Sequence, residues 1–131
     1  MKKRRIVITG AGVVSSLGFS KESLYQSLLD GRSAVRFMPE WQGQIPVGPD
    51  SVTAAPVDLP EEMSKSIKRH YRRSMGNAAL FATLAAQSAV AESGLTSTEL
   101  SGGRAGCIIS STLGSSSEVY ESTKAVIEKR F

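Results

Sequence analysis

The sequence predicts an α/β fold in which a mixed sheet is packed against helices. Two runs, residues 5–14 and 104–111, are nearly continuous in apolar and β-branched residues, which is typical of strands buried inside a sheet. Segments rich in Ala and Leu lie between these runs, and glycines follow them as helix stop signals. Strands that alternate with helices favour a layered α/β structure.

Length and composition indicate one compact domain that spans residues 1–131. The chain has 131 residues and 40% of them are hydrophobic, which is enough for one core. The formal net charge is +4, with basic clusters at residues 2–5 and 65–73, and these clusters favour an acidic partner. Cys107 is the single cysteine, which excludes an internal disulfide and predicts a cytoplasmic protein.

The chain opens with a segment that imitates a signal peptide, MKKRRIVITGAGVV. Its apolar run is β-branched, is interrupted by Gly10 and Gly12 and lacks an A-x-A cleavage pattern, so a strand is the better interpretation. No run elsewhere reaches about 18 uninterrupted apolar residues. We therefore expect neither a membrane span nor a membrane partner.

The first predicted unit consists of a strand, a loop and a helix. Residues 5–14 form the strand. Ser20 is a typical N-cap residue for a helix that places Leu24 and Leu28 on one face. Gly31 is expected to end this helix.

Residues 36–60 are expected to form an extended loop that contains at most a short strand. Several prolines and glycines interrupt this stretch, and Trp41 is expected to anchor it. A loop of this length is unusual in a minimal domain, so it is expected to pack on a partner subunit or on another part of the protein.

Two helices and a helical turn are predicted next. Residues 61–75 can form a basic helix. Residues 77–93 are rich in Ala and Leu and apolar on nearly all sides, which predicts a buried helix that ends at Gly94. Thr96 and Glu99 have the spacing of a capping box and predict another short turn.

The last predicted elements are a strand and a helix. Residues 104–111 contain Gly-Cys-Ile-Ile and form the strand. Ser115 and Glu118 have capping-box spacing at the start of the helix, and Val126 and Ile127 lie on its apolar side. No glycine, proline or asparagine follows, so the helix is expected to continue through Arg130 to the end of the chain, as a cut end would.

Three features invite a chemical role, and each has a structural interpretation. Gly10-Ala11-Gly12 partly matches the dinucleotide fingerprint, but the next helix begins too late, near Ser20, to bind a phosphate, so a structural turn is favoured. Cys107 is flanked by Gly and Ile and is predicted to be buried and unreactive. His70 lies in a basic run where solvation is expected, and the sequence lacks metal-ligand spacing.

A basic cluster is the main candidate for binding. In the helix predicted over residues 61–75, one face carries Lys65, Lys68, Arg69 and Arg72, and the opposite face carries Met63, Ile67, Tyr71 and Met75. Such a helix can bind a negatively charged partner, and the alternative is a solvated surface. Nucleic acid is disfavoured because no recognition motif or aromatic platform accompanies the charge.

Four motifs occur in the order and spacing of one family, RRIVITGAGVVSSLG, LLDGRSAV, AVAESGL and GCIISSTLG. Together they resemble the β-ketoacyl-acyl-carrier-protein synthases of type II fatty acid synthesis. The resemblance implies the thiolase fold, in which two similar α/β/α/β/α halves make up a subunit of a homodimer. It also implies that this chain supplies the N-terminal portion of that fold, most of its first half.

The resemblance also implies a reaction. The family transfers an acyl group from an acyl carrier protein to a cysteine and then condenses it with malonyl carrier protein after decarboxylation. Two histidines stabilise the enolate and the thioester oxygen. The resemblance places all three residues beyond Phe131, and Cys107 does not match the nucleophile motif, so the chain alone is expected to be inactive. No cofactor or metal ion is implied.

Within the chain, the resemblance implies two binding roles. Arg69, His70 and Arg73 stand where the family places basic residues that meet the acidic helix of the acyl carrier protein. The complete expected docking set is Lys65, Lys68, Arg69, His70, Arg72 and Arg73. Leu113 stands where an apolar residue lines or gates the acyl pocket. The family's Gly-Ser-Gly before it is replaced by Ser110-Ser111-Thr112, which predicts a stiffer loop.

Two alternatives remain open from the sequence. A catalytically silent ketosynthase-like subunit that shapes chain length would share this N-terminal part, and the residue at the downstream nucleophile position distinguishes it. A nicotinamide-dependent oxidoreductase is the second alternative, which titration with the dinucleotide tests.

Overall fold

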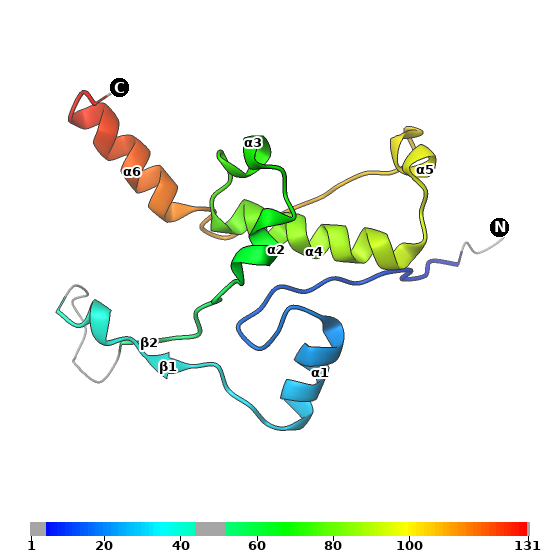
Figure 1. Cartoon of the computed structure of the whole chain (residues 1–131), viewed down its shortest axis with the longest axis horizontal. Coiled ribbons are helices and arrows are strands. Elements are labelled where there is room, and N and C mark those ends of the chain that lie inside the picture. The colour runs from blue at the N-terminus through cyan, green and yellow to red at the C-terminus, as the bar shows by residue number, and fades with distance from the viewer. Residues whose placement is uncertain (1–4, 44–51, 131) are drawn as a thin grey trace. The chain divides into compact units, whose positions relative to one another are not determined.

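The computed structural model describes residues 5–43 and 52–130 (Figure 1). The chain divides into two compact units, Val13–Leu59 and a larger unit that combines Met1–Gly12 with Pro60–Phe131. Basic residues 2–4 and the part of the predicted loop at residues 44–51 lie outside the described residues.

In the smaller unit, α1 (Lys21–Leu29) begins and ends as the sequence predicts. The Ser20 hydroxyl accepts the Ser23 N–H at 3.1 Å, and the Ser23 hydroxyl accepts the Ser20 N–H at 3.1 Å, so the two serines form a capping box. Gly31 adopts a left-handed φ of 65° after the helix. The Ser27 hydroxyl donates to the Leu17 carbonyl at 3.1 Å and ties the helix to the loop before it.

A short hairpin lies within the predicted extended loop. Strands β1 (Arg36–Phe37) and β2 (Thr53–Ala54) pair antiparallel, with Arg36 opposite Ala54. Beside them, the Met38 N–H donates to the Val52 carbonyl at 2.9 Å, and both side chains are buried. The 3₁₀ turn η1 (Pro39–Trp41) follows β1. Trp41 is exposed, so the anchoring role expected of it is not found within this unit.

The larger unit is built around α4 (Asn77–Ser93), the long green helix of Figure 1. Its bounds agree with the prediction, and Gly94 ends it with a left-handed φ of 70°. The helix contacts α2 (Glu61–Lys65). Leu84 is the one residue of this helix that is buried, so the described residues do not supply the burial that the sequence predicts for it.

Capping is confirmed for one of the remaining helices and not for the other. At α5 (Ser97–Ser101), the Thr96 hydroxyl accepts the Glu99 N–H at 3.2 Å and the Glu99 carboxylate accepts the Thr96 N–H at 2.8 Å. At α6 (Ser116–Ile127), Ser115 precedes the helix without a side-chain cap, and the predicted capping box is wrong. Ser115 and Glu118 instead pack closely against Gly76.

Helix α6 also ends earlier than expected. Lys129 takes a left-handed φ of 52°. The Arg130 N–H then donates to the Ala125 carbonyl at 2.9 Å, and the Lys129 N–H to the Val126 carbonyl at 3.2 Å. These bonds form a Schellman closure, which stops the helix without the glycine that the sequence rules look for.

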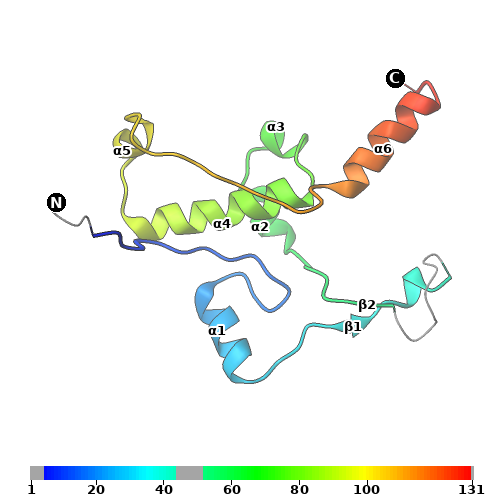
Figure 2. The ribbon, with the colours of Figure 1, turned by 180° about the vertical axis from the view of Figure 1, so that it is seen from behind.

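The two predicted buried strands are extended but unpaired. Residues 5–12 and 104–111 run beside α4 in the larger unit (Figures 1 and 2). Among the described residues the one sheet is the β1–β2 pair, and neither segment belongs to it. Ile6 and Ile108 are 96% and 99% exposed. A central strand needs neighbours on both edges, and the described residues supply none to these segments, so the predicted mixed sheet is not formed within them.

Candidate functional site

The basic cluster lies on two short helices rather than on one. The sequence predicts a single helix over residues 61–75, but the structure has α2 (Glu61–Lys65) and α3 (Arg69–Arg72) with a break between them. Lys68, directly before α3, has extended backbone angles, with φ −54° and ψ 135°. The predicted common face of Lys65 and Arg72 therefore does not exist.

Side-chain burial accompanies the break. The hydroxyls of Ser64 and Ser66 donate to the carbonyls of Glu61 and Met63, at 2.8 and 2.7 Å, and both bonds close within one helical turn. At the break, Ile67 turns inward and is 5% exposed, so burial of its side chain compensates for the lost helical turn.

The cationic side chains divide into engaged and exposed ones. Lys65 pairs with Glu61 at 3.0 Å on the surface of α2, and Arg72 Nη1 donates to Ser64 Oγ at 3.2 Å. The exposed set, which we call the α3 basic surface, consists of Lys68, Arg69, His70 and Arg73.

Like charges dominate the α3 basic surface. None of its four members makes an ion pair within the described ranges 5–43 and 52–130. The ring of His70 lies 3.9 Å from the ring of Tyr71, centroid to centroid. The unpaired cations are Lys68, Arg69 and Arg73, and cations that gather on a few residues produce a positive potential that attracts an acidic partner.

Leu113 lies in the loop between the segment 104–111 and α6, and it is 81% exposed. The turn of this loop is closed by the Gly114 N–H, which donates to Ser111 Oγ at 3.0 Å. Gly114 has a left-handed φ of 62°. A hollow of about 480 Å³ lies beside the loop, lined by residues that include Ala78, Ala82 and Ser111. Leu113 is not part of that lining, and its predicted role in the acyl pocket stays a prediction.

Cys107 is exposed, which corrects the prediction that it is buried in a strand. The reason is the unpaired state of the segment 104–111, which leaves the thiol facing a shallow hollow of about 450 Å³ shared with Val90 and Ala91. His70, the only histidine of the chain, lies on α3. Exposure alone does not make a nucleophile, which also needs a neighbouring base.

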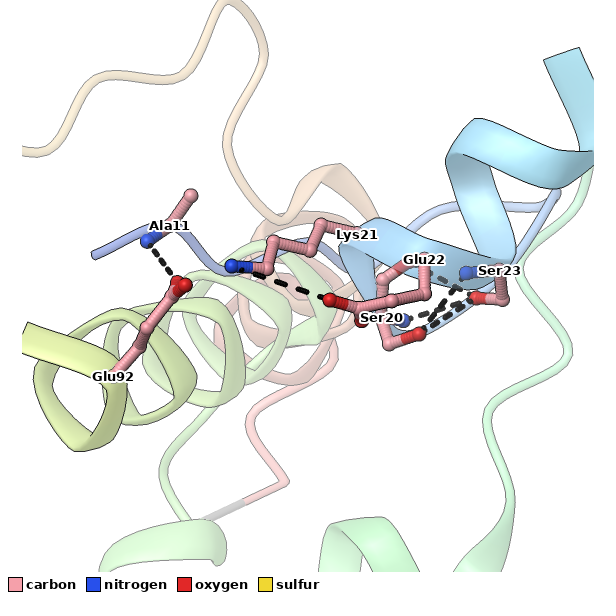
Figure 3. A network of polar contacts seen from close by, with 6 residues as sticks. All are labelled: Ala11, Ser20, Lys21, Glu22, Ser23 and Glu92. Carbon is pink, nitrogen blue, oxygen red and sulfur yellow. Dashed lines mark hydrogen bonds and ion pairs between the residues drawn. The ribbon is translucent and has the colours of Figure 1, made fainter. Parts of the chain in front are cut away.

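The Gly10-Ala11-Gly12 segment is engaged with α4. A Cβ atom on Gly10 would collide with the Ala89 carbonyl oxygen, and one on Gly12 with the Ala85 carbonyl oxygen. Between them, the Ala11 N–H donates to the Glu92 carboxylate at 2.8 Å (Figure 3). These contacts favour the structural interpretation of the motif over phosphate binding, although the glycines serve close helix contact rather than a turn.

Other site chemistry is sparse in the part of the chain that the structure describes. There, no three His, Cys, Asp or Glu side chains gather closely enough to hold a metal ion. Within the same ranges, no helix is long and apolar enough to cross a membrane. The pKa of Glu99 is lowered, first by the hydrogen bond from the Thr96 hydroxyl and then by the one from the Thr96 N–H.

Two side-chain hydrogen bonds could not be predicted from the sequence. Glu92 accepts a bond from a residue 81 positions away, and Ser64 accepts one from a residue eight positions away. Helical rules connect residues three or four apart. Glu92 is the one charged residue of α4, which is the feature of the sequence that could have indicated its contact.

The chain matches the family model described as beta-ketoacyl synthase, N-terminal domain, over residues 3–130. The chain therefore belongs to the beta-ketoacyl synthase family. This confirms the family resemblance of its motifs.

Relatives with established names agree with this assignment. The 3-oxoacyl-[acyl-carrier-protein] synthase 1 of Haemophilus influenzae is 37% identical over 112 residues, which are 86% of this chain and 26% of that protein. The enzyme of the same name from Escherichia coli (strain K12) is 35% identical over 92 residues, 70% of this chain and 21% of that protein.

A solved beta-ketoacyl synthase from Burkholderia phymatum has a similar fold. It superposes with a TM-score of 0.62 at 34% identity, over 78% of this chain and 24% of that one. The chain thus spans about a quarter of the length of the relatives that it matches.

Proposed function

We propose that this chain is the N-terminal portion of a 3-oxoacyl-acyl-carrier-protein synthase. The whole protein would catalyse the decarboxylative condensation of an acyl thioester with malonyl carrier protein. The observation that carries the proposal is the α3 basic surface in a chain of this family, because an enzyme that accepts carrier-bound substrates needs a cationic surface for an acidic carrier.

The residues of this chain would bind and position, and the chemistry would come from elsewhere. Arg69, His70 and Arg73, with Lys68, would dock the carrier protein. Leu113 would line the acyl pocket, where it would contact a growing chain. By the resemblance, the nucleophilic cysteine and the two histidines would belong to a part of the protein outside this chain. Residues 5–12 and 104–111 would then find strand partners in the thiolase-like sheet of the whole protein, which explains their apolar composition.

The expected setting follows from the same proposal. The whole protein would be a homodimer, because the resemblance implies one. It would be cytoplasmic, because the chain has a single cysteine. A nicotinamide-dependent oxidoreductase gains no support, since Gly10 and Gly12 are engaged with α4 and the Ala11 N–H is occupied by Glu92.

The proposal is tested by supplying the whole protein with acyl carrier thioester and malonyl carrier protein. We expect release of carbon dioxide together with 3-oxoacyl carrier product. If the protein is folded and binds the carrier but forms no product, the catalytically silent subunit is the correct function. If it neither binds the carrier nor forms product, the proposal is wrong.

A further inference from the structure

Arg72 differs from the basic residues around it. Its side chain is half-buried, whereas the members of the α3 basic surface are exposed. Its Nη1 donates to the Oγ of Ser64, on α2. An arginine that the protein already holds is poorly placed to reach a partner.

Ser64 is oriented to accept this bond. Its hydroxyl proton is directed at the Glu61 carbonyl, at 2.8 Å. A hydroxyl has one proton to donate and two lone pairs to accept with, so the lone pairs remain for the guanidinium of Arg72. The planar guanidinium keeps a fixed direction when it is held in this way. A chain of hydrogen bonds thus runs from α3 to the first turn of α2.

Helix α3 needs such a tie. It has four residues, and no side chain caps its first turn. A helix of one turn is marginal by itself. Among residues 61–75, Ile67 is the one buried side chain. Burial of Ile67 sets where the helix breaks. A polar contact at the last residue of α3 is needed to fix how α3 is rotated about its own axis.

We infer that Arg72 is a positioning residue, which clasps α3 to α2 and holds Arg69 and Arg73 in the arrangement that binds the carrier protein. This inference rests on the proposed function, because it takes α3 as the docking surface. Without the clasp, α3 would be more mobile, and ordering it when the carrier protein binds would cost binding free energy. Loss of the clasp is therefore expected to weaken carrier binding by about 3- to 10-fold.

Ser64→Ala is the most informative variant, because it removes the acceptor and changes no charge. The affinity of the whole protein for acyl carrier protein is measured by titration. Ser66→Ala is the matched control, since the Ser66 hydroxyl donates only to a carbonyl of its own turn. We expect Ser64→Ala to bind about 3- to 10-fold more weakly, Ser64→Thr to restore affinity, and Ser66→Ala to bind like the wild type.

Arg72→Gln completes a double-mutant cycle. It should lose at least as much affinity as Ser64→Ala, and the double variant should lose no more than Arg72→Gln alone, because both changes break one bond. Full affinity in Ser64→Ala, with a loss and a flatter salt dependence in Arg72→Gln, would mean that Arg72 contacts the carrier directly and would overturn the inference.

Hydrogen exchange without carrier tests the clasp itself. The amides of residues 69–73 should exchange faster in Ser64→Ala than in Ser66→Ala, and equal rates would overturn the inference. If the proposed function is wrong, these experiments have a different outcome. In that case the carrier binds wild type and the Arg69→Glu, Arg73→Glu variant equally or binds neither, while exchange in Ser64→Ala still rises.

Discussion

Gly10 and Gly12 allow an extended segment to lie directly on the backbone of α4. Two residues of extended chain advance about 7 Å, and four residues of helix advance about 6 Å. The two glycines therefore meet successive turns of the helix, at Ala89 and Ala85. Because the contacts involve backbone carbonyls, side-chain movement cannot relieve a clash there.

Gly12→Ala should consequently destabilise the whole protein by about 1–3 kcal/mol or more. Thermal unfolding of the variant and of the wild type checks this. Equal stability of the two proteins would show that the contact of Gly12 with Ala85 is not kept in the folded protein.

Cys107 allows a test of whether the chain by itself is catalytically inactive. Its thiol is exposed, so small alkylating reagents should modify it readily. Acyl transfer from an acyl carrier thioester should not occur, because the described residues that line the hollow at this thiol include no base that would activate it. Mass spectrometry of this 131-residue chain checks both. An acyl adduct that disappears in Cys107→Ala would contradict the assignment of catalysis to residues beyond Phe131.

The stability of the turn that Glu99 caps is expected to depend on pH. Hydrogen bonds from Thr96 hold its pKa below the ordinary value of 4.5. A lowered carboxyl pKa stabilises the folded turn above the unfolded pKa, and this contribution is lost as pH falls through the folded pKa. An NMR titration of the Glu99 carboxyl should give a lower midpoint in wild type than in Thr96→Val. Identical midpoints would exclude the capping bond as the cause.

At the scale of elements, α1 and α6 close with the same pair of backbone bonds. The left-handed residue is Gly31 after α1 and Lys129 after α6, with φ of 65° and 52°. A left-handed residue other than glycine costs about 1–2 kcal/mol. Lys129→Gly should therefore raise the free energy of unfolding by about 1 kcal/mol, and Gly31→Ala should lower that free energy by a similar amount. Thermal unfolding checks both, and a loss of stability in Lys129→Gly would contradict the closure.

The elements that could be predicted are those fixed by neighbours in sequence. The bounds of α4 and the caps of α1 and α5 depend on Gly94, Ser20 and Thr96, which act within a few residues. The break between α2 and α3 depends on the burial of Ile67, which no periodicity reveals. The strands expected at residues 5–14 and 104–111 depend on distant partners, so composition indicated their apolar character and not their pairing.

At the scale of the whole molecule, the proposed docking site could be predicted only through the family. The charges of Arg69 and Arg73 were evident from the sequence, and the resemblance gave them a role. The pattern alone could not separate them from Lys65, which pairs with Glu61, or from Arg72, which bonds Ser64. Side-chain partners depend on where the helix breaks, and that depends on burial.

Charge reversal of the α3 basic surface tests whether this surface docks the carrier protein. Kinetics of the whole enzyme carrying Arg69→Glu and Arg73→Glu are compared for carrier-bound and small thioester substrates, at low and high ionic strength. A variant with Lys124→Glu and Lys129→Glu, which changes the net charge equally on and directly after α6, is the control. We predict a KM for carrier-bound substrates about 10-fold higher in the α3 variant, a difference that shrinks as salt screens the wild type, and nearly unchanged turnover of small thioesters. Equal losses for both kinds of substrate would mean that these arginines support folding and would contradict the docking role.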